Sequence, residues 1–131
     1  MSTTTGYGKT NIDDVEDAAP KYGMGEIGEA RYVREDVGAE GIGMTLYRMN
    51  PGKRGGFGHR HERAEEMYVV LSGSGRVKID DSILELRPLD VVRVAPASVR
   101  ELEAGADGMQ VLAFGTHVKD DGEMLQEWWV D

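Results

Sequence analysis

The chain has 131 residues, no cysteine, and 24 acidic against 15 basic side chains, which gives a formal net charge of −9. A chain of this length has room for one domain with one hydrophobic core. A surface this acidic repels phosphate backbones and anionic lipid head groups, so neither a nucleic-acid-binding nor a membrane-surface protein is expected. Without cysteine, disulfides, thiolate nucleophiles and cysteine-ligated zinc are excluded, and the redox compartment stays open.

The sequence contains no recognisable secretory signal and no candidate membrane-spanning segment. The first ten residues are rich in Ser, Thr and Gly and contain no apolar core of a secretory signal. No stretch of the chain approaches the roughly 18 apolar residues of a membrane-spanning helix. The cytoplasm is therefore the expected location.

Residues 1–25 are predicted to form an irregular N-terminal arm in front of a domain at 26–131. Within this arm residues 11–17 read NIDDVED, a polar run with only two isolated apolar side chains. Such a run fits either a loose tail or one short helical turn. The arm is expected to be disordered or to pack on a partner.

Short apolar runs separated by Gly, Pro and Asp turns follow the arm, which is typical of closely spaced strands. The predicted strands are 30–34, 43–49, 66–71, 76–79, 83–86, 91–94, 99–102 and 109–114. A loop is expected at 51–58, a turn at 72–75, and the one possible helical turn at 122–129. This order predicts an all-β protein, an antiparallel sandwich or barrel.

The segment 58–73, GHRHERAEEMYVVLSG, carries the most informative side chains. On a strand, His59 and His61 point to the same face with Cα atoms roughly 6.6 Å apart, so both imidazoles can reach one ion. Glu66 opens the next strand and can fold back over the pair. Two imidazoles and a carboxylate form an open site for Fe, Mn, Ni, Zn or Cu. From spacing alone, a solvated strand edge explains the same residues equally well.

The run His59-x-His61-x4-Glu66-x6-Gly73 resembles the first cupin motif. The order of turns after it is similar to that of small single-domain bacterial cupins, over about Arg31 to Gly115. This resemblance implies a double-stranded β-helix, a jelly-roll barrel with the site inside it. It also implies that His59, His61 and Glu66 are three of the four usual ligands of a divalent transition metal.

The fourth ligand of the cupin pattern is missing. The second cupin motif places a histidine ten residues after an Asp, and the tenth residue after Asp90 is Arg100. Counting from Pro96 instead points to Glu101. Arg100 is preferred, because Leu102 shares its face and suits an inward core position. A guanidinium beside the site weakens cation binding and favours an anionic ligand.

Expectations for Tyr68, His117 and the C-terminal tryptophans follow from their positions in the sequence. Tyr68 is predicted, with Arg100, to contact a ligand inside the barrel, although an aromatic side chain on a strand is more often plain core. His117 lies outside both motifs and is expected at the surface. Trp128 and Trp129 are expected to pack back over the barrel or to lie at a subunit interface.

The sequence favours a metal-binding protein for a small molecule, and it does not decide whether the protein is an enzyme. No nucleophile and base can be named, so any reaction would depend on the metal and would act on a small anionic substrate. The alternative is a metal-free ligand-binding or regulatory cupin with a vestigial site. A homodimer is expected, because a small barrel leaves edge strands with unpaired backbone groups.

Overall fold

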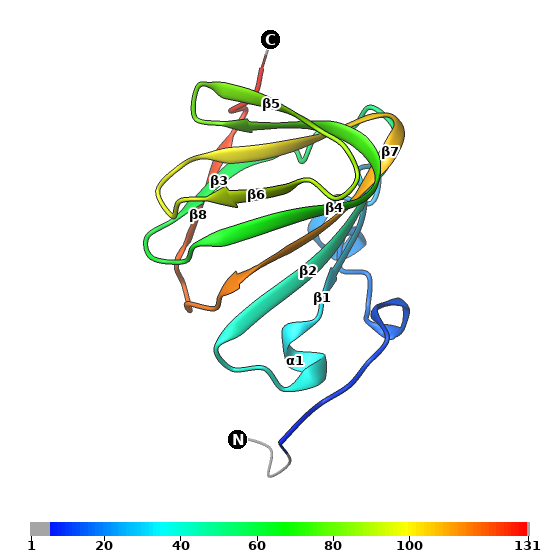
Figure 1. The fold of residues 1–131 in the computed structure, drawn as a ribbon, viewed down its shortest axis with the longest axis vertical. Coiled ribbons are helices and arrows are strands. Elements are labelled where there is room, and N and C mark those ends of the chain that lie inside the picture. The colour runs from blue at the N-terminus through cyan, green and yellow to red at the C-terminus, as the bar shows by residue number, and fades with distance from the viewer. Residues whose placement is uncertain (1–5, 131) are drawn as a thin grey trace.

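A computed structural model describes residues 6–130, and Figure 1 shows a curled antiparallel sheet. The helical segments in this part of the chain are short, namely Ile12–Asp14, Pro20–Tyr22 and α1 (Arg34–Val37). The strands are β1 (Gly28–Tyr32), β2 (Ile42–Met49), β3 (Phe57–His61), β4 (Glu66–Ile79), β5 (Ser82–Leu86), β6 (Val91–Val94), β7 (Arg100–Thr116) and β8 (Gly122–Gln126). The all-β double-stranded β-helix expected from the sequence is confirmed.

The two long strands β4 and β7 pair with each other and belong to both layers of the barrel. The first layer has the order β1-β2-β7-β4-β6 and uses the C-terminal part of β7. The second has the order β8-β3-β7-β4-β5 and uses the N-terminal part of β7. Figure 1 shows β4 and β7 crossing the molecule between the β1–β2 pair and the β3–β8 pair.

The turn predicted at 72–75 is wrong, because β4 continues through it from Glu66 to Ile79. Its pairing with β7 is only shifted, between Val70 and Ser72 and again between Gly73 and Gly75. Gly73 has φ 76°, and a side chain there would collide with the backbone of Gly108. Glycine therefore lets the paired strands bend from one layer into the other without ending.

Three further element predictions need correction. The strands predicted at 99–102 and 109–114 form one strand, β7. The segment expected to be a helical turn at 122–129 begins as strand β8, which pairs with β3 from Phe57↔Gln126 to His61↔Gly122. It supplies backbone partners for an edge of β3 that would otherwise be open. The predicted first strand ends at Tyr32, and α1 follows at Arg34–Val37.

The core lies between the two layers and follows the alternation of the strands. In β4 the inward positions begin with Glu66, Tyr68 and Val70, and the last two are almost completely buried. The other members of the buried cluster are Met49, Val77, Leu86, Val94, Leu102, Ala104, Met109, Val111 and Ala113. Because alternate positions from Glu66 to Val70 point inward, this part of β4 delivers one carboxylate, that of Glu66, into the interior.

The described part of the N-terminal arm packs on the barrel of its own chain. Val15, Ala18 and Ala19 are buried. The Asp17 carboxylate accepts hydrogen bonds from the backbone N–H groups of Ala19 and Ala30, each at 3.0 Å. The bond to Ala30 links the arm to β1. The residues between the arm and β1 lie against the barrel.

The two C-terminal tryptophans also pack back over their own barrel. Trp129 is buried, with the Arg54 guanidinium 4.3 Å from its ring centroid. Lys78 lies 4.7 Å from the ring centroid of Trp128. The sequence predicted that the pair packs over the barrel or lies at a subunit interface, and the structure shows packing on the barrel.

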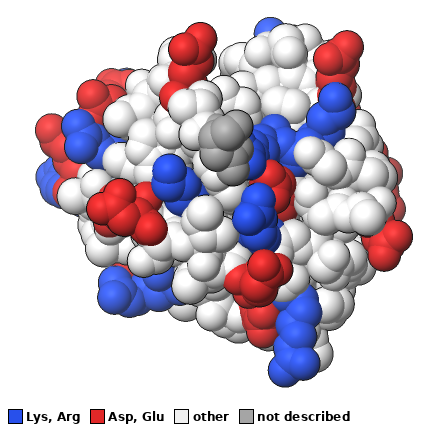
Figure 2. Space-filling model, turned by 90° about the horizontal axis from the view of Figure 1, so that it is seen from above, with Lys and Arg blue, Asp and Glu red and all other residues white. Residues whose placement is uncertain are grey.

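The surface at the β5 end of the barrel carries both signs of charge. Figure 2 shows acidic and basic side chains interspersed among neutral ones on this face. Among residues 6–130 no helix is long and apolar enough to cross a membrane.

Candidate metal centre

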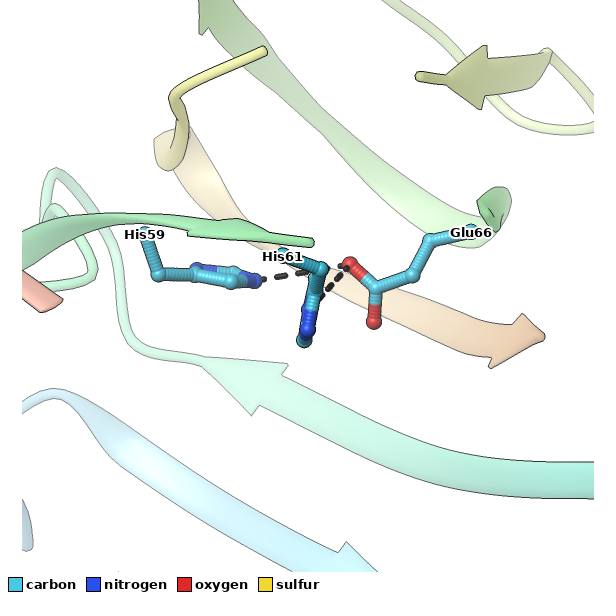
Figure 3. A group of neighbouring side chains, drawn as sticks. All are labelled: His59, His61 and Glu66. Atoms are coloured by element: carbon cyan, nitrogen blue, oxygen red, sulfur yellow. Dashed lines mark hydrogen bonds and ion pairs between the residues drawn. The ribbon is translucent and has the colours of Figure 1, made fainter. Parts of the chain in front are cut away.

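Strand β3 and the first residue of β4 bring three potential ligands together inside the barrel (Figure 3). His59 and His61 occupy alternate positions of β3 and point inward. Arg60, between them, points outward and its Nε donates to Glu123 at 2.6 Å. Glu66 starts β4 after a short connection and extends toward both rings, as the sequence predicted.

The ligand atoms are close enough for one ion. Glu66 Oε1 lies 3.4 Å from His59 Nε2 and 3.7 Å from His61 Nε2, and the ligand atoms of all three residues lie within 4.8 Å of one another. Bonds of about 2.0–2.2 Å to a common ion require such spacing. Both ring nitrogens of His61 are buried without a hydrogen-bond partner among the described residues. An imidazole left in this state fits a metal ligand.

The Glu66 carboxyl is ionised despite its partial burial. Burial raises its pKa, but the hydrogen bond to His59, the nearby His61 ring and the charge of Arg100 outweigh that effect. Together they hold the pKa of Glu66 well below its ordinary value. A carboxylate that stays charged is a ready ligand for a cation.

Arg100, the first residue of β7, lies directly beside the three ligands. It pairs in register with His59, so the two side chains share the inner face, and it is fully buried. Its Nη2 donates to the Ala95 carbonyl at 3.0 Å, and its Nη1 lies 3.8 Å from Glu66 Oε1. A positive charge therefore stands at the edge of the candidate metal centre.

The alternative residue, Glu101, is buried but is not one of the three converging ligands. Its Oε2 accepts the backbone N–H of Gly56 at 3.2 Å, and burial raises the pKa of its carboxyl. Its carboxylate is directed to Gly56 rather than to the three ligands. The third histidine, His117, is exposed after the end of β7, as expected.

Tyr68 completes the inner surface around Glu66. Its hydroxyl donates to Glu66 Oε1 at 3.4 Å and its side chain is almost completely buried. Burial and the charge of Glu66 raise the pKa of the Tyr68 phenol, so the group stays neutral and keeps its proton.

Asp121, between β7 and β8, is a site residue that sequence reasoning missed. Its carboxylate accepts the backbone N–H groups of Arg63 and Ala64, and its Oδ2 lies 3.6 Å from His61 Nδ1. Burial raises the pKa of Asp121, but the N–H groups and the nearby charges lower it below its ordinary value. A carboxylate facing Nδ1 orients the ring and leaves Nε2 free for an ion. Sixty residues separate the pair, so no local spacing reveals it.

A cavity of about 110 Å³ adjoins the centre. His59 and Tyr68 line it together with residues of β1, β2, β3 and β7 and with Ala19, Met24 and Ile27 of the segment before β1. The site is thus reached through a space inside the barrel.

This arrangement can be compared with known proteins. Residues 45–113, more than half of the chain, match the sequence profile of the Cupin domain. The chain belongs to the cupin family. None of the curated proteins compared with this cupin matches it.

Solved structures share its fold at low sequence identity. A cupin protein from Bacteroides fragilis is 22% identical, with a TM-score of 0.71 over 98% of this chain and 99% of that one. Oxalate decarboxylase from Bacillus subtilis is 21% identical, with a TM-score of 0.77 over 96% of this cupin but 34% of the decarboxylase. A sugar phosphate isomerase of the cupin superfamily from Silicibacter pomeroyi is 13% identical, with a TM-score of 0.69 over 91% and 92%. These likenesses support the fold alone.

We predict that Asp121→Asn weakens metal binding by about tenfold, because the amide still accepts the backbone N–H groups but no longer holds the His61 tautomer by charge. Asp120→Asn, at the exposed neighbouring position, is the control and should bind metal like the wild type. Isothermal titration calorimetry with Zn²⁺ or Mn²⁺ measures the affinities of both variants and of the wild type. Equal affinities in all three proteins would rule out a role for Asp121 in holding His61.

Proposed function

We propose that this cupin binds a small molecule next to one divalent transition metal held by His59, His61 and Glu66. The convergence of three ligand atoms within 4.8 Å, one from an otherwise unpartnered buried imidazole, carries the proposal. The metal, Fe, Mn, Ni, Zn or Cu, would supply a Lewis acid with open positions. His59 and His61 would hold it, and Asp121 would orient His61.

Arg100 stands where the resemblance expected a fourth ligand, and we propose that it limits the affinity of the site. A buried guanidinium needs a negative partner, and the nearest carboxylate is that of Glu66. A metal and Arg100 would therefore compete for the carboxylate of Glu66. If Arg100 instead orients an anionic substrate, as the sequence suggested, that anion has to approach beside Glu66.

A metal-free ligand-binding or regulatory cupin is the second candidate, and the Arg100–Glu66 contact favours it. In that state Glu66 is already paired with a cation, and the two histidines serve as hydrogen-bonding groups. Any reaction at this site would need the metal.

We also propose a homodimer, through a face other than the one expected from the sequence. Trp129 is buried in its own chain. Met44, Phe114 and Met67 instead form one row across β2, β7 and β4 on the outer side of the first layer, and both methionines are exposed. A contiguous apolar row on a sheet face is typical of an interaction surface, and the same face on a second copy matches it.

We predict about one transition metal per chain in protein purified without an affinity tag and equilibrated with Zn²⁺ or Mn²⁺. The double variant His59→Ala/His61→Ala should lose the metal and keep its fold, because two of the three ligands are gone. Elemental analysis and circular dichroism measure the two properties. His117→Ala, at the exposed third histidine, is the control. Equal metal content in the wild type and the double variant would exclude this site.

We predict that the wild type has a dimeric mass by light scattering at micromolar concentration and that Met67→Lys shifts it to the monomer, since the variant places a charge in the apolar row. Met124→Lys, on exposed β8, makes the same change elsewhere and should leave the dimer intact. A monomeric wild type would refute the homodimer. A dimer that Met67→Lys leaves unchanged would refute this face.

A further inference from the structure

The cavity beside the metal centre has an almost entirely apolar wall. Six of its larger lining residues are Ile27, Tyr32, Tyr47, Met49, Phe57 and Leu102. They come from β1, β2, β3, β7 and the segment before β1, so the wall is assembled from distant parts of the sequence. Tyr32 is 47% exposed, so this part of the wall reaches the surface.

None of the described residues that line this cavity has a lysine or arginine side chain. Arg100, which the sequence suggested as the partner of an anion, is fully buried, is not part of the wall, and faces Ala95 and Glu66. An anion entering the cavity would lose its hydration without gaining a counter-charge, and it would meet the negative charge of Glu66 near the inner end. Burial of an unpaired charge costs several kcal/mol, so the wall selects against anions.

The two acidic residues of the wall do not offer a charge to a cationic ligand either. Glu29 is paired with Arg31 at 2.9 Å and with Arg48 at 3.2 Å. Glu101 accepts a hydrogen bond from the backbone of Gly56. Glu101 Oε1 is buried without a hydrogen-bond partner, and burial raises the pKa of this carboxyl, which favours its neutral form. The other polar groups of the wall are His59, Glu101 Oε1 and three tyrosine phenols. Burial raises the pKa of the phenols of Tyr32, Tyr47 and Tyr68, so they keep their protons.

The volume limits the size of a ligand. An enclosed apolar cavity of about 150 Å³ accepts one benzene molecule. The space of about 110 Å³ here is smaller, but it reaches the surface, so a ligand of comparable size can extend outward past Tyr32. The wall accommodates a single ring or a short branched chain.

We propose that the cavity binds a neutral, predominantly apolar molecule about the size of one aromatic ring, with a single polar group directed toward His59 and Tyr68. This assignment deepens the proposed function by naming the class of its ligand, and it differs from the anionic class expected from the sequence. The apolar wall binds the ring whether or not a metal is present. Binding of the ring and binding of the metal can therefore be tested separately.

Benzyl alcohol and benzoate are suitable probes, because both carry one ring and differ in charge. Their affinities are measured by NMR titration of the metal-free protein and again after addition of Zn²⁺, with metal content determined on the same samples. We expect benzyl alcohol to bind the metal-free wild type at least about tenfold more tightly than benzoate does. If the wild type binds no Zn²⁺ but still prefers benzyl alcohol over benzoate, the metal centre is refuted and the proposed ligand class is supported.

Two variants locate the binding site. Ala30 is buried in the wall, and Ala30→Leu fills space that the ring needs, so it should weaken benzyl alcohol binding by about tenfold or more. Ile27→Lys adds a cation to the wall and should raise the affinity for benzoate relative to benzyl alcohol. Ile83→Lys, on exposed β5, is the matched control and should leave the ratio unchanged.

Three results would overturn the assignment. They are a metal-free wild type that binds neither probe, one that binds benzoate as tightly as benzyl alcohol, and an Ala30→Leu variant with unchanged affinity for benzyl alcohol. Should Ala30→Leu fail to fold, the Ile27→Lys and Ile83→Lys pair decides: equal ratios in these two variants overturn the assignment.

Discussion

The carboxylate of Glu66 is the group on which the other side chains of the interior converge. His59, His61, Tyr68 and Arg100 all approach its Oε1, at 3.4, 3.7, 3.4 and 3.8 Å respectively. A carboxylate in an apolar barrel stays ionised only where donors and positive charge surround it. The neighbours that keep it charged also compete for it, and a bound metal would join that competition. Under the proposed function, the balance between Arg100 and a metal at Glu66 would determine whether this cupin holds an ion.

The bent strands β4 and β7 make this convergence possible. β4 contributes Glu66 and Tyr68 at one end, and β7 contributes Arg100, which pairs with His59 of β3. Glycines at the bends let both strands pass between layers, with shifts in the register of their pairing. The apolar cavity and the polar centre thus share one interior, with His59 and Tyr68 belonging to both.

Local patterns in the sequence predicted the parts that depend on local rules. Alternation on a strand was enough to place His59 and His61 on one face, and the face shared with Leu102 was enough to favour Arg100 over Glu101. The turn at 72–75 was mispredicted, because glycines that permit a turn also permit a bend within a paired strand. β8 was missed because its formation depends on the free edge of β3, a tertiary condition. The role of Asp121 and the composition of the cavity wall could not be predicted from the sequence for the same reason, because the residues that meet there are distant in the sequence.

The central claim, that Arg100 and a metal compete for Glu66, is tested most directly by titrating the wild type, Arg100→Gln and Arg100→His with Zn²⁺ under identical conditions. Arg93→Gln serves as control, because Arg93 is an exposed arginine that pairs with Glu65 at 3.1 Å. The account predicts that Arg100→Gln binds more tightly than the wild type, since it removes the competing charge. Arg100→His should bind most tightly, by about tenfold or more, because it also adds an imidazole ligand. If both Arg100 variants fold and bind Zn²⁺ no more tightly than the wild type and Arg93→Gln, the competition does not exist.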